Sequence, residues 1–150
     1  MSVYVVDASV FVADARPSEP HHFDANTFLK YGAATQSLIY TPTIVLPEIA
    51  AAIARGHQRP TLAQRLVKAL QGFPHIKIIP IEETLANLAA ELAAQSRIRG
   101  CDAIYVALAQ SKNAILITLD QEQKSRTPSS ITVRTPGEEV ALLRPPPSTN

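Results

Sequence analysis

Two apolar runs decide the fold of this chain, VYVVD at residues 3–7 and ILITLD at residues 115–120. Each run is long enough for one strand and ends in an aspartate. Apolar side chains at nearly every position indicate strands that are covered on both faces, as in the parallel sheet of an α/β protein. We therefore expect a central sheet with helices on both sides.

Strand-like and helix-like segments alternate along the chain, which favours crossover connections and a mostly parallel sheet. We predict five strands, at residues 3–6, 38–41, 76–79, 115–118 and 131–134. Helices are expected at residues 21–34, 61–70, 82–96 and 102–112, with a short helix starting near Phe11 and another opening at Pro42 and Thr43. Because Pro47 has no N–H to donate, that last helix either starts later or bends.

The length and composition are those of one ordinary domain. A chain of 150 residues, 46% of them hydrophobic, can bury about two thirds of its unfolded surface. We predict a single domain at residues 1–143 and a disordered or extended tail at residues 144–150, which is rich in proline. The net charge of +1 gives no reason to expect a nucleic-acid or membrane partner, so any basic patch must be local.

Cys101 is the only cysteine, which excludes an internal disulfide and fits a reducing cytoplasm. Its neighbours favour a small buried residue over a reactive thiol. No apolar run reaches the roughly 18 residues needed to cross a bilayer, and the first residues lack the basic leader of a secretory signal. We expect a cytoplasmic protein without a membrane partner.

Four acidic residues stand where an apolar strand ends or a helix begins: Asp7, Glu48, Asp102 and Asp120. In an open α/β sheet, functional groups gather beyond the carboxyl ends of the strands. Clustered carboxylates repel one another unless a cation neutralises them, and their hard oxygens suit Mg²⁺ or Mn²⁺. A shared metal site is one interpretation. The other is local: helix caps at Asp102 and Ser9, a helix-dipole partner at Glu48 and an Asx turn at Asp120.

The segments around these acids resemble the PIN-domain nucleases, and the size of the chain favours the VapC-type ribonuclease toxins of type II toxin-antitoxin systems. The resemblance rests on VVDAS at residues 5–9, PEI at 47–49, CDAIYVALA at 101–109 and ITLD at 117–120, and covers essentially residues 1–143. The sequence departs from the family at Cys101, where relatives often carry an aromatic residue, and at Pro47, where a helix former is usual.

This resemblance implies a three-layer fold with five parallel strands in the order 3-2-1-4-5. It also implies Mg²⁺- or Mn²⁺-dependent RNA cleavage, a cognate antitoxin and commonly a homodimer. The catalytic and metal-binding positions carry over as Asp7, Glu48, Asp102 and Asp120. Glu122 is the nearest candidate for a further acid, which would bind metal through water or simply face solvent. From its place at the strand-to-helix turn, Ser9 could support a carboxylate or a metal-bound water.

Basic side chains close to the acids could hold RNA phosphates. Four candidates flank the motifs: Arg97, Arg99, Lys124 and Arg126. Compensation of helix dipoles or solubility explains the same residues equally well. The histidines stand at helix ends or in loops away from the acids, and we expect none of them to bind the metal.

Two other acid-rich families fit less well. A phosphatase of the haloacid dehalogenase type needs a second acid two positions after the first, where this chain has Ser9. A response-regulator receiver needs an aspartate after its third strand, where the chain has Pro80 and Ile81. The alternative that stays open is a catalytically inactive PIN-like module that binds RNA or protein. Contacts with a partner are expected around Phe23, Phe28, Ile44 and Leu46, with burial in the core as the competing fate.

Overall fold

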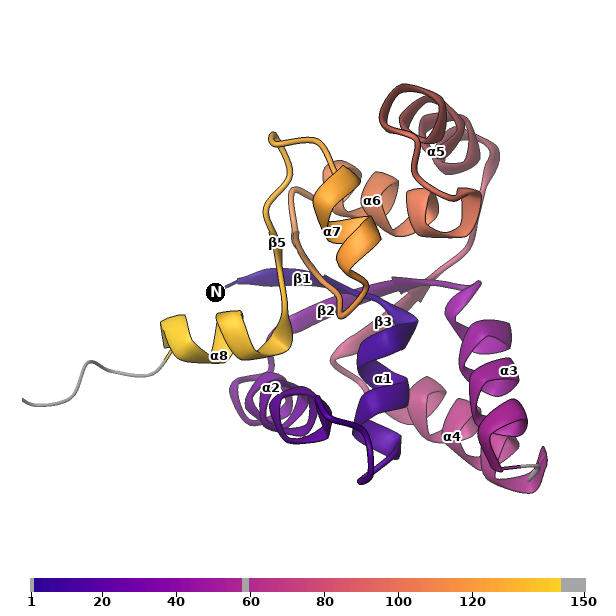
Figure 1. Cartoon of the computed structure of the whole chain (residues 1–150), viewed down its shortest axis with the longest axis vertical. Coiled ribbons are helices and arrows are strands. Elements are labelled where there is room, and N and C mark those ends of the chain that lie inside the picture. The colour runs from indigo at the N-terminus through magenta and orange to yellow at the C-terminus, as the bar shows by residue number, and fades with distance from the viewer. Residues whose placement is uncertain (1, 58–59, 144–150) are drawn as a thin grey trace, which may run out of the picture.

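The computed structural model describes residues 2–57 and 60–143 (Figure 1). Its five strands form one parallel sheet in the order β3-β2-β1-β4-β5. The predicted fold class and strand order are therefore confirmed. The tail predicted at residues 144–150 lies outside the described residues.

The strands are β1 (Val3–Val6), β2 (Leu38–Pro42), β3 (Ile76–Ile79), β4 (Ile115–Ile117) and β5 (Val133–Arg134). β1 lies in the middle of the sheet, where Val5 is paired with Tyr40 of β2 on one side and Leu116 of β4 on the other. Val5 is completely buried, as are Tyr4 and Val6. The apolar run of β1 thus reflects burial on both faces of the sheet.

The last two strands are shorter than predicted. β4 ends at Ile117 rather than Thr118, and β5 starts at Val133 rather than Ile131. The N–H of Ile131 donates to the carbonyl of Pro128 at 3.0 Å, so the chain is still turning at that point. Local turn formation therefore delays the start of β5.

The helices of the described residues are α1 (Ala8–Ala15), α2 (His22–Thr35), α3 (Val45–His57), α4 (Pro60–Gly72), α5 (Glu83–Ser96), α6 (Gly100–Lys112), α7 (Gln121–Arg126) and α8 (Pro136–Leu143). α1 starts earlier than predicted, because the Asp7 side chain accepts from the N–H of Ser9 and caps it. α3 starts later than Thr43, so Pro47 falls in its first turn, where no N–H is required. The short helices α7 and α8 were not predicted.

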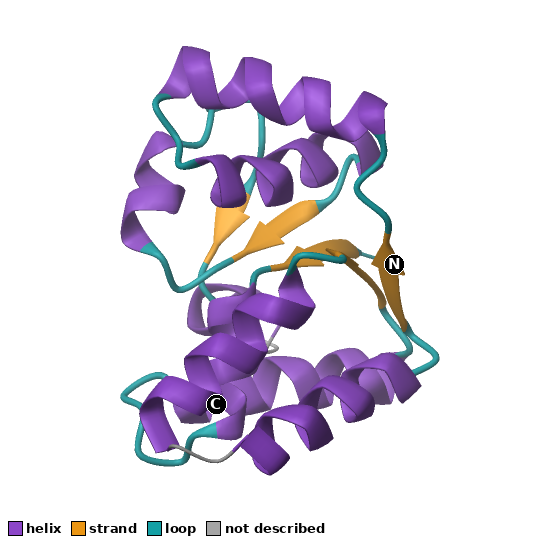
Figure 2. Cartoon of the chain, turned by 90° about the vertical axis from the view of Figure 1, so that its right-hand side faces the viewer, coloured by secondary structure: helices purple, strands orange, loops and turns teal. Residues whose placement is uncertain are grey.

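Helices cover both faces of the sheet (Figures 1 and 2). α5, α6 and α7 lie on one side, and α1, α2, α3, α4 and α8 lie on the other. α6 packs against β1, β2 and β4, and its small residues Ala103 and Ala107 are fully buried, which lets the helix approach the sheet closely. None of the described helices is long and apolar enough to span a bilayer.

The carboxyl ends of β1 and β4 lie side by side, because the strands are parallel neighbours and Val6 is paired with Ile117. From β1 the sheet continues to β2 on one side and to β4 on the other. In open α/β sheets such a reversal of strand order leaves a crevice in which ligands bind. The aspartates that end the two apolar runs follow these two strands.

Candidate active site

The four predicted acids, which lie far apart in the sequence, line a single cavity of about 510 Å³. Asp7 follows β1 and Asp120 follows β4, while Glu48 and Asp102 lie in the first turns of α3 and α6. Each acid is thus delivered to the cavity by a different segment of the chain. The cavity lies beyond the carboxyl ends of the two central strands.

Asp7 is almost completely buried, with 5% exposure. Its Oδ2 accepts hydrogen bonds from the N–H and the hydroxyl of Ser9, at 3.1 and 2.5 Å, and from the hydroxyl of Thr118 at 3.2 Å. Burial raises the pKa of Asp7 to about 6; the bonds from Ser9 oppose the rise, and the charges of Glu48 and Asp102 add to it. The same carboxylate therefore caps α1 and faces other acids.

Two hydroxyl groups tie the ends of the central strands together. The Ser9 hydroxyl, which donates to Asp7, also accepts from the N–H of Leu119 at 3.1 Å. The Thr118 hydroxyl, which also donates to Asp7, accepts from the N–H of Asp120 at 3.1 Å. The contact predicted between Ser9 and a carboxylate is present, whereas its alternative role as a helix cap is wrong, because Asp7 holds that position. Thr118 was missed, although a hydroxyl two positions before Asp120 in an otherwise apolar run is a usable signal.

Asp102 and Asp120 share one cation, the guanidinium of Arg99. Its Nε lies 2.9 Å from Asp102 Oδ2, and its Nη2 lies 2.7 Å from Asp120 Oδ2. Burial nevertheless raises the pKa of Asp102, because desolvation outweighs the bond and the charge of Arg99. The Asp120 Oδ1 accepts from the N–H of Gln123 and caps α7. The alternative role of Asp102 as a cap is wrong, since α6 begins two residues before it.

Glu48 is held by a buried tyrosine. The hydroxyl of Tyr105, a residue of α6 with no exposed surface, donates to Glu48 Oε1 at 2.6 Å. Burial raises the pKa of Glu48, and the bond from Tyr105 opposes that rise. Burial, helped by the nearby Asp7 and Glu48 carboxylates, raises the pKa of Tyr105 as well. Sequence reasoning missed this role, although Tyr105 stands one helical turn after Asp102 and so shares its face of α6.

The predicted phosphate contacts are distributed differently from the expectation. Of the four candidates only Arg99 lines the cavity. Lys124 is paired with Glu138, and Arg126 is paired with Glu122 at 2.8 Å. Arg126 also donates to the backbone carbonyl of Arg97. Arg55, on α3, lines the cavity and was not predicted.

The chemistry of the donors fits a hard dication, because the cavity presents carboxylate oxygens from four acids. In residues 2–57 and 60–143, however, no group of three or more His, Cys, Asp or Glu side chains is arranged to hold one ion. Protein donors explain this arrangement: Ser9 and Thr118 hold Asp7, Tyr105 holds Glu48, and Arg99 holds the other two acids. Metal binding at Asp102 and Asp120 would require the guanidinium of Arg99 to leave them.

Cys101 is exposed, so the prediction that it is buried is wrong. α6 turns its Asp102 and Ala103 inward, and the neighbouring Cys101 consequently faces solvent.

Among the histidines whose side chains the structure describes, His21 and His22 lie at the start of α2 and His75 precedes β3. None of these three lines the acidic cavity.

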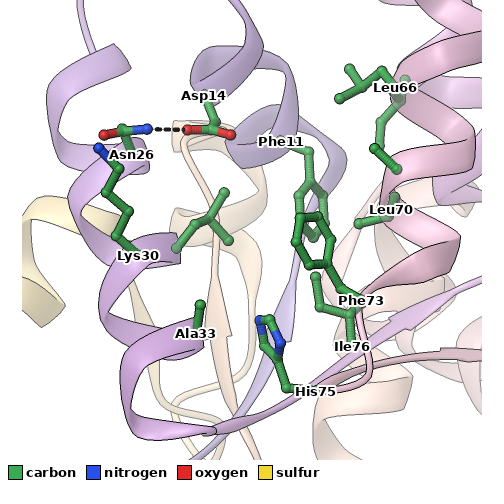
Figure 3. Close-up of a pocket in the computed structure, with 13 residues that line it drawn as sticks. Phe11, Asp14, Asn26, Lys30, Ala33, Leu66, Leu70, Phe73, His75 and Ile76 are labelled. Carbon is green, nitrogen blue, oxygen red and sulfur yellow. Dashed lines mark hydrogen bonds between the residues drawn. The ribbon is translucent and has the colours of Figure 1, made fainter.

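A second, apolar cavity of about 220 Å³ lies between α1, α2 and α4 (Figure 3). Phe11, Leu66, Leu70 and the half-exposed Phe73 form much of its wall. The partner surface predicted from sequence is not supported as one patch, because Phe28 is fully buried and Ile44 lines the acidic cavity. Phe23 alone of that group is largely exposed, at 69%.

The order of the strands and the acid-lined cavity beyond the carboxyl ends of β1 and β4 define an α/β protein of the PIN type. A family model for the PIN domain matches residues 4–127, most of the chain, and the chain belongs to this family. The resemblance seen in the sequence is thereby confirmed. A comparison with curated proteins finds no match.

Several solved structures share the fold of this chain. A chain of VapBC2 from Rickettsia felis, bound to a promoter DNA fragment, is 18% identical with a TM-score of 0.68; the match covers 89% of this chain and 98% of that one. VapC20 from Mycobacterium tuberculosis, a toxin that cleaves the sarcin-ricin loop, is 17% identical with a TM-score of 0.67 and coverages of 81% and 93%. FitAcB from Neisseria gonorrhoeae is 18% identical with a TM-score of 0.68, and the match covers 89% of this chain and 97% of that one.

Proposed function

We propose that this chain is a metal-dependent endoribonuclease that hydrolyses RNA phosphodiester bonds and acts as the toxin of a toxin-antitoxin pair. The observation that carries the proposal is the convergence of Asp7, Glu48, Asp102 and Asp120 in one cavity at the edge of the sheet. Membership of the PIN family supports it, as does the likeness in fold to a toxin that cleaves the sarcin-ricin loop. As an RNA-cleaving toxin it would act in the cytoplasm.

Asp7, Asp102 and Asp120 would hold one or two Mg²⁺ or Mn²⁺ ions, with Glu48 assisting and Glu122 contributing through water. A bound dication supplies a water molecule of lowered pKa and polarises the phosphodiester. The chain's own hydrogen bonds orient the acids for this task. Ser9 and Thr118 hold one oxygen of Asp7, and Tyr105 holds one oxygen of Glu48, so that the remaining oxygens are free to face the cavity.

RNA phosphates need cations at the mouth of the cavity. Arg55 and Arg99 line it and are the first candidates. Arg97, Lys124 and Arg126 would contact flanking phosphates, the last two after releasing Glu138 and Glu122.

The proposed protein partner is a cognate antitoxin, with a homodimer of the chain as the commonest assembly of such toxins. One structure with the same fold is a toxin-antitoxin complex from Klebsiella pneumoniae. The apolar cavity between α1, α2 and α4 could receive apolar side chains of the antitoxin (Figure 3). Half-exposed Phe73 at this cavity would become buried in such a complex.

One observation favours the second candidate, a catalytically inactive PIN-like module that binds RNA or protein. Arg99 already neutralises Asp102 and Asp120, and the acids are not grouped as ligands of one ion. In such a module the acids would be held permanently by protein donors. The two functions differ in whether a dication supports cleavage.

The test is cleavage of labelled RNA by the purified chain with Mg²⁺, with Mn²⁺ and with a chelator, followed by sequencing of the RNA ends. Asp7→Asn and Asp102→Asn should lower metal-dependent cleavage at least about a hundredfold while the circular dichroism spectrum is unchanged. Asp14→Asn is the matched control, because Asp14 lines the apolar cavity instead. Cleavage that persists in both site variants, or in the chelator, would exclude the proposed enzyme.

A further inference from the structure

We infer that Arg99 is a built-in counterion that competes with the divalent ion for Asp102 and Asp120. The ion is then held only when the guanidinium leaves. This inference rests on the proposed function, since it describes how the same site passes from protein-held acids to metal-held acids.

The geometry shows one cation placed between two acids that come from different segments. Arg99 immediately precedes α6, which carries Asp102, while Asp120 follows β4. The guanidinium uses Nε for one acid and Nη2 for the other, at 2.9 and 2.7 Å. This fork is a property of arginine, whose donors point in fixed directions in one plane. Both carboxylates are thus neutralised together by a single side chain.

Helix stability does not explain the placement of Arg99. The residue occupies the N-cap position of α6, but its side chain makes no capping hydrogen bond to the helix. A positive charge is also unfavourable at this end of a helix, where the dipole is itself positive. The attraction of the two acids is therefore what holds the guanidinium in the cavity.

The side chain can leave the cavity at a small cost. It is 64% exposed, whereas Asp102 and Asp120 are 12% and 26% exposed. Ion pairs with an exposed partner contribute little, because water replaces them readily. A dication carries twice the charge and takes several carboxylate oxygens at once, so it has the advantage in the exchange. The released guanidinium would remain at the mouth of the cavity, where a phosphate could take the place of the carboxylates.

The inference is tested by calorimetric titration of the RNA-free protein with Mn²⁺. In wild type, Mn²⁺ must displace the exposed ion pairs of Arg99, which Arg99→Ala lacks. Arg99→Ala should therefore bind Mn²⁺ about three- to tenfold more tightly than wild type. Arg55→Ala is the matched control: it removes one positive charge from the same cavity, but Arg55 forms no ion pair within the described residues. Its affinity should stay within about twofold of wild type.

Arg99→Lys separates charge from geometry, because lysine keeps the charge without the fork. Its Mn²⁺ affinity should lie between those of wild type and Arg99→Ala. If Arg99→Ala does not fold, Arg99→Gln is titrated in its place, since glutamine keeps a hydrogen-bond donor but not the charge.

The outcomes distinguish the inference from the proposed function. Mn²⁺ binding to Arg99→Ala that is as weak as, or weaker than, binding to wild type overturns the counterion role and leaves the metal site standing. An equal gain of Mn²⁺ affinity in Arg55→Ala also overturns it, because the loss of any positive charge from the cavity would then explain the tighter binding. Binding by neither wild type nor Arg99→Ala overturns both the inference and the metal-dependent function.

Discussion

Replacement of Tyr105 by phenylalanine removes the buried hydroxyl that holds Glu48, one of the acids of the cavity. That hydroxyl donates to Glu48 at 2.6 Å, and Tyr105 has no exposed surface. A hydrogen bond to a charged group contributes about 1.5–3 kcal/mol to stability. Since Glu48 is only half-buried and water can reach it, we expect the free energy of unfolding to fall by about 1.5 kcal/mol.

The functional effect should exceed the loss of stability. Groups that orient metal-binding side chains typically change affinity or activity by about 10- to 100-fold, and partial exposure of Glu48 places this variant near the lower limit of about tenfold in kcat. The lost bond also lowered the pKa of Glu48, so this pKa should rise in Tyr105→Phe. The acid limb of the pH–rate profile should therefore move to higher pH.

The assay combines urea denaturation with kcat and KM for RNA cleavage across pH. Tyr40→Phe is the matched control, because Tyr40 lies on β2 and its hydroxyl makes no hydrogen bond within the described residues. The reasoning is refuted if Tyr105→Phe loses stability while kcat and the acid limb stay at their wild-type values. Tyr105 would then be only a structural residue.

Two further predictions concern the stability of the site. Burial raises the pKa of Asp7 to about 6, so the folded state binds its proton more tightly than the unfolded state, and stability should fall as the pH rises from about 4 to 6. Above that range Asp7→Asn, which keeps a capping oxygen, should be more stable than wild type by up to about 3 kcal/mol, and below pH 4 it should have no such advantage. Urea denaturation of both proteins at pH 4 and pH 8 measures the difference. A difference in stability that does not depend on pH would contradict the assignment. Thr118→Val keeps the shape of a fully buried side chain but leaves the N–H of Asp120 without its acceptor, which should cost about 1–3 kcal/mol. Thr27→Val, on the surface of α2, is its control and should change stability by less than about 0.5 kcal/mol; equal effects of the two substitutions would argue against the Thr118 linkage.

The main lines of the fold and the positions of the acids could be read from the sequence, because both depend on local patterns. An apolar run that ends in Asp7 or Asp120 indicates a buried strand and places a carboxylate at its end. Where local signals were weak, prediction was less successful: α7 contains no apolar residue, and the turn at Ile131 shortened β5. Cys101 was placed inside because Gly100 precedes it and an apolar helix follows, although one residue along a helix changes the face by about 100°.

The sequence by itself determined a parallel α/β sheet with four carboxylates beyond its strand ends, because burial on both faces and chain reversals leave marks within a few residues. Only the tertiary structure decided which groups hold those carboxylates. Tyr105 reaches Glu48 across 57 positions, Thr118 reaches Asp7 across 111, and Arg99 joins Asp102 to Asp120, whereas Lys124 and Arg126 are drawn to other acids. Such contacts depend on the packing of distant segments against one another, and nothing in the neighbouring sequence records the partner.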